Sequence, residues 1–242
     1  MNKDKKYLVI LISIIVVLAA AFGVYAVMHK GEKTCKAEET DAIKFKREYE
    51  EFNGKNYENT DIAYFDVNLS SNNLFKYVKA DKAVEFLKND TGVIYFGFPQ
   101  CPWCRTLVPY LEEIGKSFGI KNIYYLNILD LRDSYELEDK KVVKTKEGSK
   151  EYYELLDILD KYLEEYFLTN DNGKKIDTGV KRLYAPTTVV VKDGKIVDFH
   201  EGTVESQKKF VALTKEEISE LKKRLSNMFI KISTTACTDT GC

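Results

Sequence analysis

Two cysteines separated by two residues are the part of this sequence best suited to chemistry. They lie in the segment FGFPQCPWCR, residues 96–105, as Cys101 and Cys104. A short apolar run precedes the pair and a helical pattern follows it. Two thiols at this spacing can cycle between a dithiol and a disulfide. The pair therefore indicates redox chemistry.

Cys101 is the expected nucleophile because it lies at the start of the helical pattern. The free N–H groups and the dipole of a helix N-terminus lower the pKa of a thiol from about 8.5 toward about 3.5–7.5. Pro102 loses no hydrogen bond at the first helical position. Cys104, one turn further on, is expected to be buried and to resolve a mixed disulfide. Trp103 is expected to cover the pair and to form a contact surface.

Two other interpretations of the pair stay open. In a zinc site, Cys237 and Cys242 would supply the other two ligands, although their wider spacing in a polar tail departs from the usual pattern. In a structural disulfide, closing so short a loop would add little stability. We expect neither, and we expect no metal and no cofactor.

The surrounding pattern predicts an α/β unit that positions the pair. Residues 93–96 form a short apolar strand, residues 102–117 an amphipathic helix and residues 122–129 a second strand. This β-α-β order places the cysteines at the first strand-to-helix turn, where open α/β sheets carry their chemistry.

The rest of the chain completes a central mixed sheet flanked by helices. We expect a strand at 62–69, a helix at 80–87, and a hairpin with strands at 187–191 and 196–200 around Asp193-Gly194. A last helix opens at Thr214 with Glu217 as a capping box. A helical insertion at about 131–182, with its clearest helix at 150–167 and a turn at 171–173, precedes the hairpin.

Composition limits the classes of function. The chain has 242 residues, 44% of them hydrophobic, which suits one domain with appendages. It carries 37 basic and 38 acidic residues, and this balance offers no basic field for nucleic acid. We expect no nucleic-acid partner.

The N-terminus carries an uncharged apolar run, residues 7–28, that is long enough to span a bilayer. Lysines before it favour a cytoplasmic N-terminus and place the rest of the chain outside. We expect a single-pass membrane anchor, with a cleaved signal peptide as the alternative. The expected boundaries are 1–30 for the stub and anchor, 31–60 for a tether with a short helix, 61–232 for the domain and 233–242 for a flexible tail.

The pair and a downstream proline together resemble the thioredoxin superfamily. The resemblance rests on the apolar strand, the C-P-W-C motif that opens a helix, and Ala185-Pro186 at the entry of a later strand. It implies a thioredoxin-like fold in which Pro186 follows a cis peptide bond and lies against the cysteines. It also implies that Pro102, Trp103, Ala185 and Pro186 border a substrate groove.

The segment around the cysteines is most similar to membrane-anchored bacterial thioredoxin-like proteins described as bacteriocin transport accessory proteins. One position departs from the superfamily pattern. Thioredoxin carries a buried acid six residues before its first cysteine, where this chain has Tyr95. The resemblance therefore leaves the proton acceptor for Cys104 unassigned.

The three other cysteines, Cys35, Cys237 and Cys242, each allow more than one role. Cys237 and Cys242 could form a structural disulfide, or a second redox pair that exchanges with the first. Cys35 could be free, pair with the tail or link two copies of the chain.

These patterns predict a membrane-anchored extracytoplasmic thiol–disulfide oxidoreductase. Its partners would be protein thiol or disulfide substrates and a redox partner of unknown identity. The direction of the reaction depends on a reduction potential that the sequence does not reveal. The alternative is a non-catalytic binding or accessory module of a membrane export system.

Overall fold

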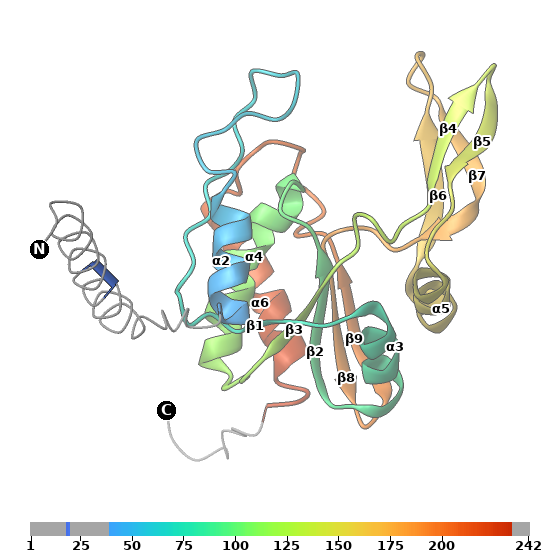
Figure 1. The fold of residues 1–242 in the computed structure, drawn as a ribbon. Coiled ribbons are helices and arrows are strands. Elements are labelled where there is room, and N and C mark those ends of the chain that lie inside the picture. Colours follow the sequence, from blue (N-terminus) through green and yellow to red (C-terminus); the bar gives the residue numbers. More distant parts are fainter. Residues whose placement is uncertain (1–17, 20–38, 234–242) are drawn as a thin grey trace, which may run out of the picture. The chain divides into compact units, whose positions relative to one another are not determined.

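A mixed five-stranded sheet forms the centre of the protein in the computed structural model, which describes residues 18–19 and 39–233 (Figure 1). Its strand order is β1-β3-β2-β8-β9. The strands are β1 (Phe75–Tyr77), β2 (Gly92–Gly97), β3 (Ile123–Asn127), β8 (Thr187–Lys192) and β9 (Lys195–Glu201). β1, β3 and β2 run parallel, whereas β8 is antiparallel to both β2 and β9. The expected α/β class is confirmed in this general form.

Helices cover both faces of the sheet (Figure 1). One face packs against α2 (Asp41–Glu50), α4 (Pro102–Ser117) and α6 (Lys215–Phe229), and the other against α3 (Ala80–Asn89) and α5 (Lys150–Leu159). Side chains alternate between the two faces along β2. Val93 and Tyr95 belong to the hydrophobic core on the first face, and Ile94 and Phe96 belong to the core on the second face. β2 is therefore buried on both faces.

Local signals place several elements where the sequence predicts them. α4 covers the expected residues 102–117, and Thr214 and Glu217 form the expected capping box of α6. The turn between β8 and β9 uses Asp193 and Gly194 at φ of 50° and 68°, which suits a short hairpin. These features depend on neighbouring residues and are therefore readable from the sequence.

The short helix expected within the tether belongs to the domain instead. α2 begins at Asp41, and its Phe45 and Tyr49 are fully buried against the sheet. The expectation that residues 31–60 form a tether is wrong for this part of the chain. The apolar residues of α2 form a stripe that the first face of the sheet covers.

Residues 62–69 do not form the expected strand. The side chain of Asn53 binds the backbone of this segment: it accepts a hydrogen bond from Val67 N at 2.9 Å and donates one to Val67 O at 2.7 Å. Leu69 N also donates to a carboxylate oxygen of Glu50 at 2.9 Å. Side chains thus satisfy backbone groups that a sheet partner would otherwise bind.

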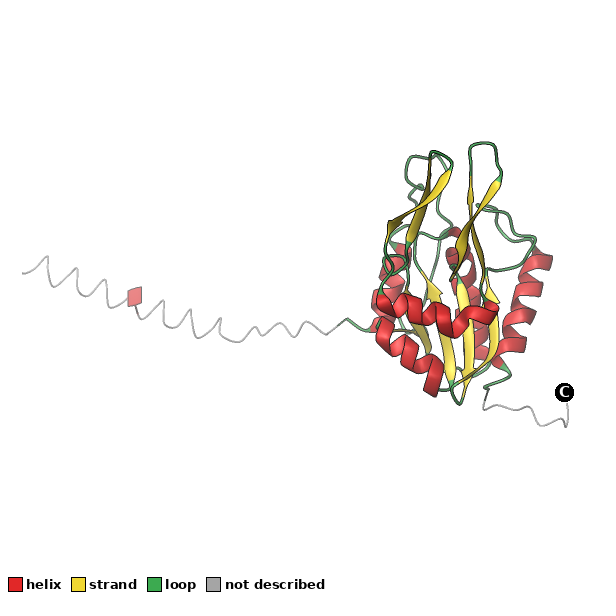
Figure 2. Cartoon of the chain, turned by 90° about the vertical axis from the view of Figure 1, so that its right-hand side faces the viewer, coloured by secondary structure: helices red, strands yellow, loops and turns green. Residues whose placement is uncertain are grey.

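The insertion is not mainly helical. It contains two antiparallel hairpins, β4 (Ser134–Glu138) with β5 (Lys141–Lys146) and β6 (Glu164–Thr169) with β7 (Lys175–Arg182). α5 and the short 3-10 helix η1 (Asp160–Tyr162) lie between them. The hairpins extend beyond one end of the sheet (Figure 2).

The helix expected at 150–167 ends at Leu159 because the following residues pair as a strand. β6 binds β7 across a turn at which Asn170 accepts from the backbone N–H groups of Asn172 and Lys174. The apolar spacing continued a helical pattern, but the pairing partner lies further along the chain. The turn expected at 171–173 is therefore a hairpin turn.

No helix within residues 18–19 and 39–233 is long and apolar enough to cross a membrane. The expected anchor, residues 7–28, lies almost wholly outside the described residues, as do Cys35, Cys237 and Cys242.

Candidate functional site

The two cysteines lie where β2 ends and α4 begins. Cys101 is the N-cap of α4, and its sulfur accepts a hydrogen bond from the backbone N–H of Cys104 at 3.3 Å. Both thiols are free, with Cys101 4% exposed and Cys104 fully buried. The helix start thus brings the two cysteines together and leaves only the first one with a small exposed area.

The segment before β8 lies against the first cysteine. The peptide bond between Ala185 and Pro186 is cis, as the resemblance implied. The thiol of Cys101 donates to Ala185 O at 3.3 Å. Ionised Cys101 cannot donate, and Ala185 O then becomes available to a backbone N–H of an incoming chain.

The surroundings of the two thiols differ in their effect on ionisation. Burial alone would raise the pKa of Cys101, but hydrogen bonds from Cys104 and from the backbone N–H groups of Cys104 and Trp103 lower it below its ordinary value. The positive charge of Arg132 acts in the same direction. Burial, together with the neighbouring Cys101, raises the pKa of Cys104 well above its ordinary value. Cys101 is therefore the thiol prepared to attack.

A pair of buried tyrosines lies behind Cys104. The hydroxyl of Tyr95 on β2 lies near enough to the Cys104 thiol to lower its pKa, and Cys104 in turn raises the pKa of Tyr95. The hydroxyl of Tyr49 on α2 lies 2.9 Å from that of Tyr95. Both tyrosines are fully buried. The buried side chain behind Cys104 on β2 thus ends in a hydroxyl group and not in a carboxyl group.

Arg105 is a buried cation that joins the helices around the site. Its guanidinium donates to Phe65 O at 2.6 Å, Tyr49 O at 2.7 Å, Pro99 O at 3.3 Å and Asn53 Oδ1 at 2.6 Å. Only 1% of the residue is exposed. All four acceptors are neutral, so the arginine acts as a hydrogen-bonding centre rather than as one half of an ion pair. It fixes α2, and with it Tyr49, against the start of α4.

A groove of about 940 Å³ begins beside the cysteines. Trp103 and Ala185 line its near end, and residues of β6 and β9 line its walls. The charged residues among its lining are mostly acidic: Glu164, Glu165, Glu201 and Glu205, against Lys175. The groove therefore presents backbone and aromatic groups near the thiols and negative charge further along.

Glu201 is strained electrostatically at the wall of this groove. Burial, together with the charge of Glu164, raises the pKa of Glu201 from 4.5 to about 7. One of its carboxylate oxygens is buried without a hydrogen-bond partner. Ionisation of Glu201 is therefore unfavourable in the folded protein.

We expect Glu201 to make the free energy of unfolding depend on pH. Between about pH 4.5 and 7 the native state binds one more proton than the unfolded state, so this contribution falls as pH rises. Burial lowers the pKa of His200 to about 4, so His200 makes the free energy of unfolding rise with pH. The parent and the Glu201→Gln variant both contain His200, so its contribution cancels when they are compared. Urea unfolding of the parent and of Glu201→Gln across this range should show the variant gaining stability relative to the parent. Parallel curves would contradict the assignment.

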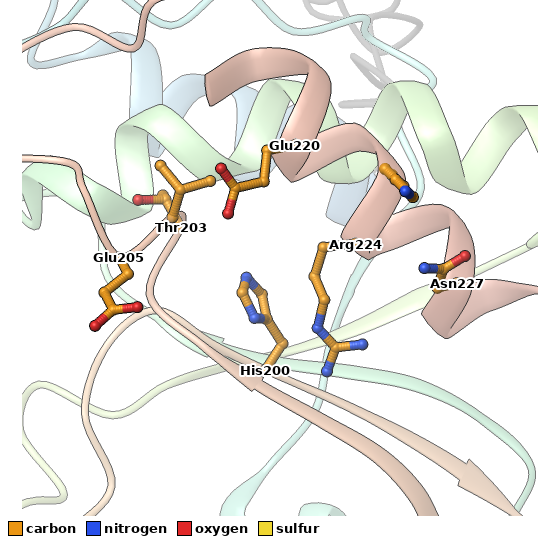
Figure 3. Close-up of a pocket in the computed structure, with 8 residues that line it drawn as sticks. His200, Thr203, Glu205, Glu220, Arg224 and Asn227 are labelled. Carbon is orange, nitrogen blue, oxygen red and sulfur yellow. The ribbon is translucent and has the colours of Figure 1, made fainter. Parts of the chain in front are cut away.

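A second cavity, of about 290 Å³, lies between the end of β9 and α6 (Figure 3). It is lined by His200, Thr203, Glu205, Arg224 and neighbouring residues of α6. Its lining includes neither cysteine of the pair. It shares His200, Thr203, Val204 and Glu205 with the groove beside the cysteines.

The structure brings together five residues that the sequence singled out: Cys101, Trp103, Cys104, Ala185 and Pro186. Pro102 begins α4 between the cysteines and is buried rather than open to a groove. The tail cysteines, the possible second pair, lie outside the described residues. Within those residues, no group of three or more His, Cys, Asp or Glu side chains could hold a metal ion.

Sequence reasoning missed three contributors to the site. Tyr49 belongs to the helix expected in the tether, Arg105 directly follows the cysteine pair, and Glu201 ends the last strand. Only the position of Arg105 beside Cys104 gave a signal in the sequence. Tyr49 and Glu201 are distant from the cysteines in the sequence, and the tertiary structure brings them to the site.

Comparison of the chain with protein-family models and with curated proteins finds no match.

Proposed function

We propose that the chain is a thioredoxin-like thiol–disulfide oxidoreductase that exchanges disulfides with protein substrates. The observation that carries this proposal is the asymmetry of the pair: one thiol caps a helix and is prepared to ionise, and the other is buried behind it. A purely structural disulfide does not require its two thiols to differ in pKa. The exchange itself requires no cofactor.

Each step of the proposed reaction uses a group in the site. The Cys101 thiolate attacks one sulfur of a substrate disulfide, forming a mixed disulfide and releasing the other substrate sulfur as a thiolate. Cys104 then attacks Cys101, forming the Cys101–Cys104 disulfide. The remaining substrate sulfur leaves as a thiolate and takes up a proton. The substrate gains two electrons and the protein loses two, and the reverse sequence oxidises a substrate dithiol.

The arrangement of the sheet supports the thioredoxin-like assignment. The cysteines follow a central parallel strand, β2, and the cis-proline precedes the antiparallel strand β8 that pairs with it. Both features agree with the resemblance seen in the sequence. We further propose that residues 7–28 anchor the chain in a membrane and that the domain lies on the extracytoplasmic side, where disulfides persist.

Measurement of the reduction potential tests the function and gives its direction. The full chain should equilibrate with a glutathione redox buffer and show a two-electron transition of the Cys101–Cys104 pair. A potential near about −270 mV would indicate a reductant, and one near about −120 mV an oxidant. A pair that stays reduced or oxidised across the whole range, with no exchange with peptide disulfides, would instead favour the non-catalytic module.

The acidic groove predicts a preference among substrates. A peptide disulfide with lysine beside its cysteine should react about threefold to tenfold faster than its glutamate counterpart, since carboxylates line the groove. The preference should increase as pH rises through about 7, where Glu201 ionises. Stopped-flow kinetics with matched peptides would measure it.

The control for this preference uses charge changes at two places. Glu201→Gln should reduce the preference for lysine, whereas Glu113→Gln on α4, whose carboxylate binds Lys222 at 2.6 Å outside the groove, should leave it unchanged. Equal rates for both peptides with the parent would exclude charge selection by the groove.

A further inference from the structure

The sulfur of Cys104 lies in a closed part of the core. Burial raises the pKa of Cys104 most, the neighbouring Cys101 raises it further, and the hydroxyl of Tyr95 and the backbone of Phe98 lower it. None of these carries a carboxyl group. Since a buried thiolate has lost its water, its negative charge must be stabilised by hydrogen bonds from the protein.

The ring of Tyr95 is directed toward the cysteines by the strand that carries it. Tyr95 and Gly97 lie on the same face of β2, and a Cβ atom at Gly97 would lie only 2.2 Å from the Tyr95 hydroxyl oxygen. The absence of a side chain at Gly97 is therefore what lets the Tyr95 ring extend along the strand. The ring also stacks on Tyr125, with centroids 5.6 Å apart.

The hydroxyl of Tyr49 supports that of Tyr95 from the other side. Their oxygens are 2.9 Å apart, and Arg105 holds the backbone carbonyl of Tyr49 at 2.7 Å. Either hydroxyl can donate in this pair; when Tyr49 donates, the hydroxyl proton of Tyr95 is free for another acceptor, and the Cys104 sulfur is near it. A chain of two hydroxyl groups strengthens each hydrogen bond within it.

Tyr95 is suited to donate a hydrogen bond and not to accept a proton. Burial, followed by the nearby charge of Cys104, raises the pKa of Tyr95 well above its ordinary value. The phenol therefore keeps its proton at the pH at which Cys104 reacts.

We propose that Tyr95, oriented by Tyr49, is the hydrogen-bond donor that stabilises the Cys104 thiolate as it resolves the mixed disulfide. The inference rests on the proposed exchange reaction and assigns a role to a position at which the sequence left the chemistry of Cys104 open. In this step the Cys104 S–H bond breaks, the Cys101–Cys104 bond forms and the Cys101–substrate bond breaks. The proton passes through solvent to the departing substrate thiolate, and Tyr95 keeps its own proton throughout.

Titration of Cys104 tests this role independently of any exchange activity. In the full chain carrying Cys101→Ser, with Cys35, Cys237 and Cys242 also replaced by serine, ¹³C-labelled Cys104 gives a single Cβ resonance to follow against pH. Adding Tyr95→Phe should raise the pKa of Cys104 by about one unit or more, because a hydrogen bond to a charged group is lost. An unchanged pKa would overturn the proposal, even if the chain exchanges disulfides.

Single-turnover kinetics supply the second test, with the two cysteines of the pair intact. Tyr95→Phe should leave mixed-disulfide formation within about twofold of the parent and slow its resolution by about tenfold to a hundredfold. Tyr49→Phe should slow resolution by about threefold, since it removes only the orienting bond. Resolution at the parent rate in Tyr95→Phe would overturn the proposal.

The matched control is Tyr124→Phe. Tyr124 lies on the neighbouring strand β3 and packs against Phe86 on the other face of the sheet. Tyr124→Phe also removes one hydroxyl group, and mixed-disulfide formation and its resolution should both proceed at the parent rates. Urea unfolding of each variant separates a loss of folding from a loss of chemistry.

Discussion

Cys101→Ser is expected to abolish disulfide exchange, whereas Cys104→Ser is expected to stop it halfway. Removal of Cys101 takes away the only thiol of the pair that keeps any exposed area, 4%, and whose pKa is lowered. The rate with a peptide disulfide should fall by more than about a thousandfold. This is the largest effect on activity that the site predicts.

Cys104→Ser leaves the attacking thiol in place. The backbone N–H of residue 104 still donates to the Cys101 sulfur, so the first step should proceed. A serine hydroxyl cannot resolve the mixed disulfide, and the covalent complex with the peptide should accumulate. Mass spectrometry under non-reducing conditions would show the protein plus one peptide.

The control is Cys35→Ser, which makes the same chemical change outside the pair and should leave both steps intact. Exchange at the parent rate by Cys101→Ser would contradict the assignment of the nucleophile. A Cys104→Ser variant that turns over fully would show that another group resolves the complex.

Arg105→Met should cause the largest loss of stability. The substitution leaves three backbone carbonyls and the Asn53 side chain without their donor in a region where the arginine is 1% exposed. Unsatisfied buried acceptors cost about 1–3 kcal/mol each before relaxation, so we expect a loss of about 3–5 kcal/mol in the free energy of unfolding. Urea unfolding followed by circular dichroism would measure it.

Two further variants make this result specific. Arg105→Lys keeps the charge but cannot reach four acceptors from one ammonium group, and should lose less than Arg105→Met. Lys222→Met removes a cation whose partner, Glu113, lies at the surface, and should cost at most about 1 kcal/mol. A cost of less than about 1 kcal/mol for Arg105→Met would show that water replaces the guanidinium.

Elements controlled by neighbouring residues were predictable from the sequence. Helix α4, the Asp193-Gly194 turn and the capping box of α6 all depend on contacts within a few residues. The start of α4 also places the backbone N–H of Cys104 on the Cys101 sulfur. The division of labour between the two thiols follows from this short-range geometry.

Elements that depend on a distant partner were not predictable in the same way. Residues 164–169 continue the helical spacing of α5, yet they form β6 because β7 pairs with them. Residues 62–69 alternate like a strand, but Asn53 and Glu50 occupy their backbone groups. The spacing of apolar residues does not show which groups will form hydrogen bonds with the backbone of a segment.

The amino-acid sequence by itself determined the arrangement on which the proposed exchange depends: two thiols at the opening of a helix, with Cys101 at the N-cap, because a helix start and a spacing of three residues are local properties. The tertiary structure decided what surrounds that chemistry. It brings Tyr49 from α2, Tyr95 from β2 and Ala185 from the segment before β8 to the same pair of sulfurs. These residues are far apart in the chain, and only the packing of α2 and the sheet around α4 makes them neighbours.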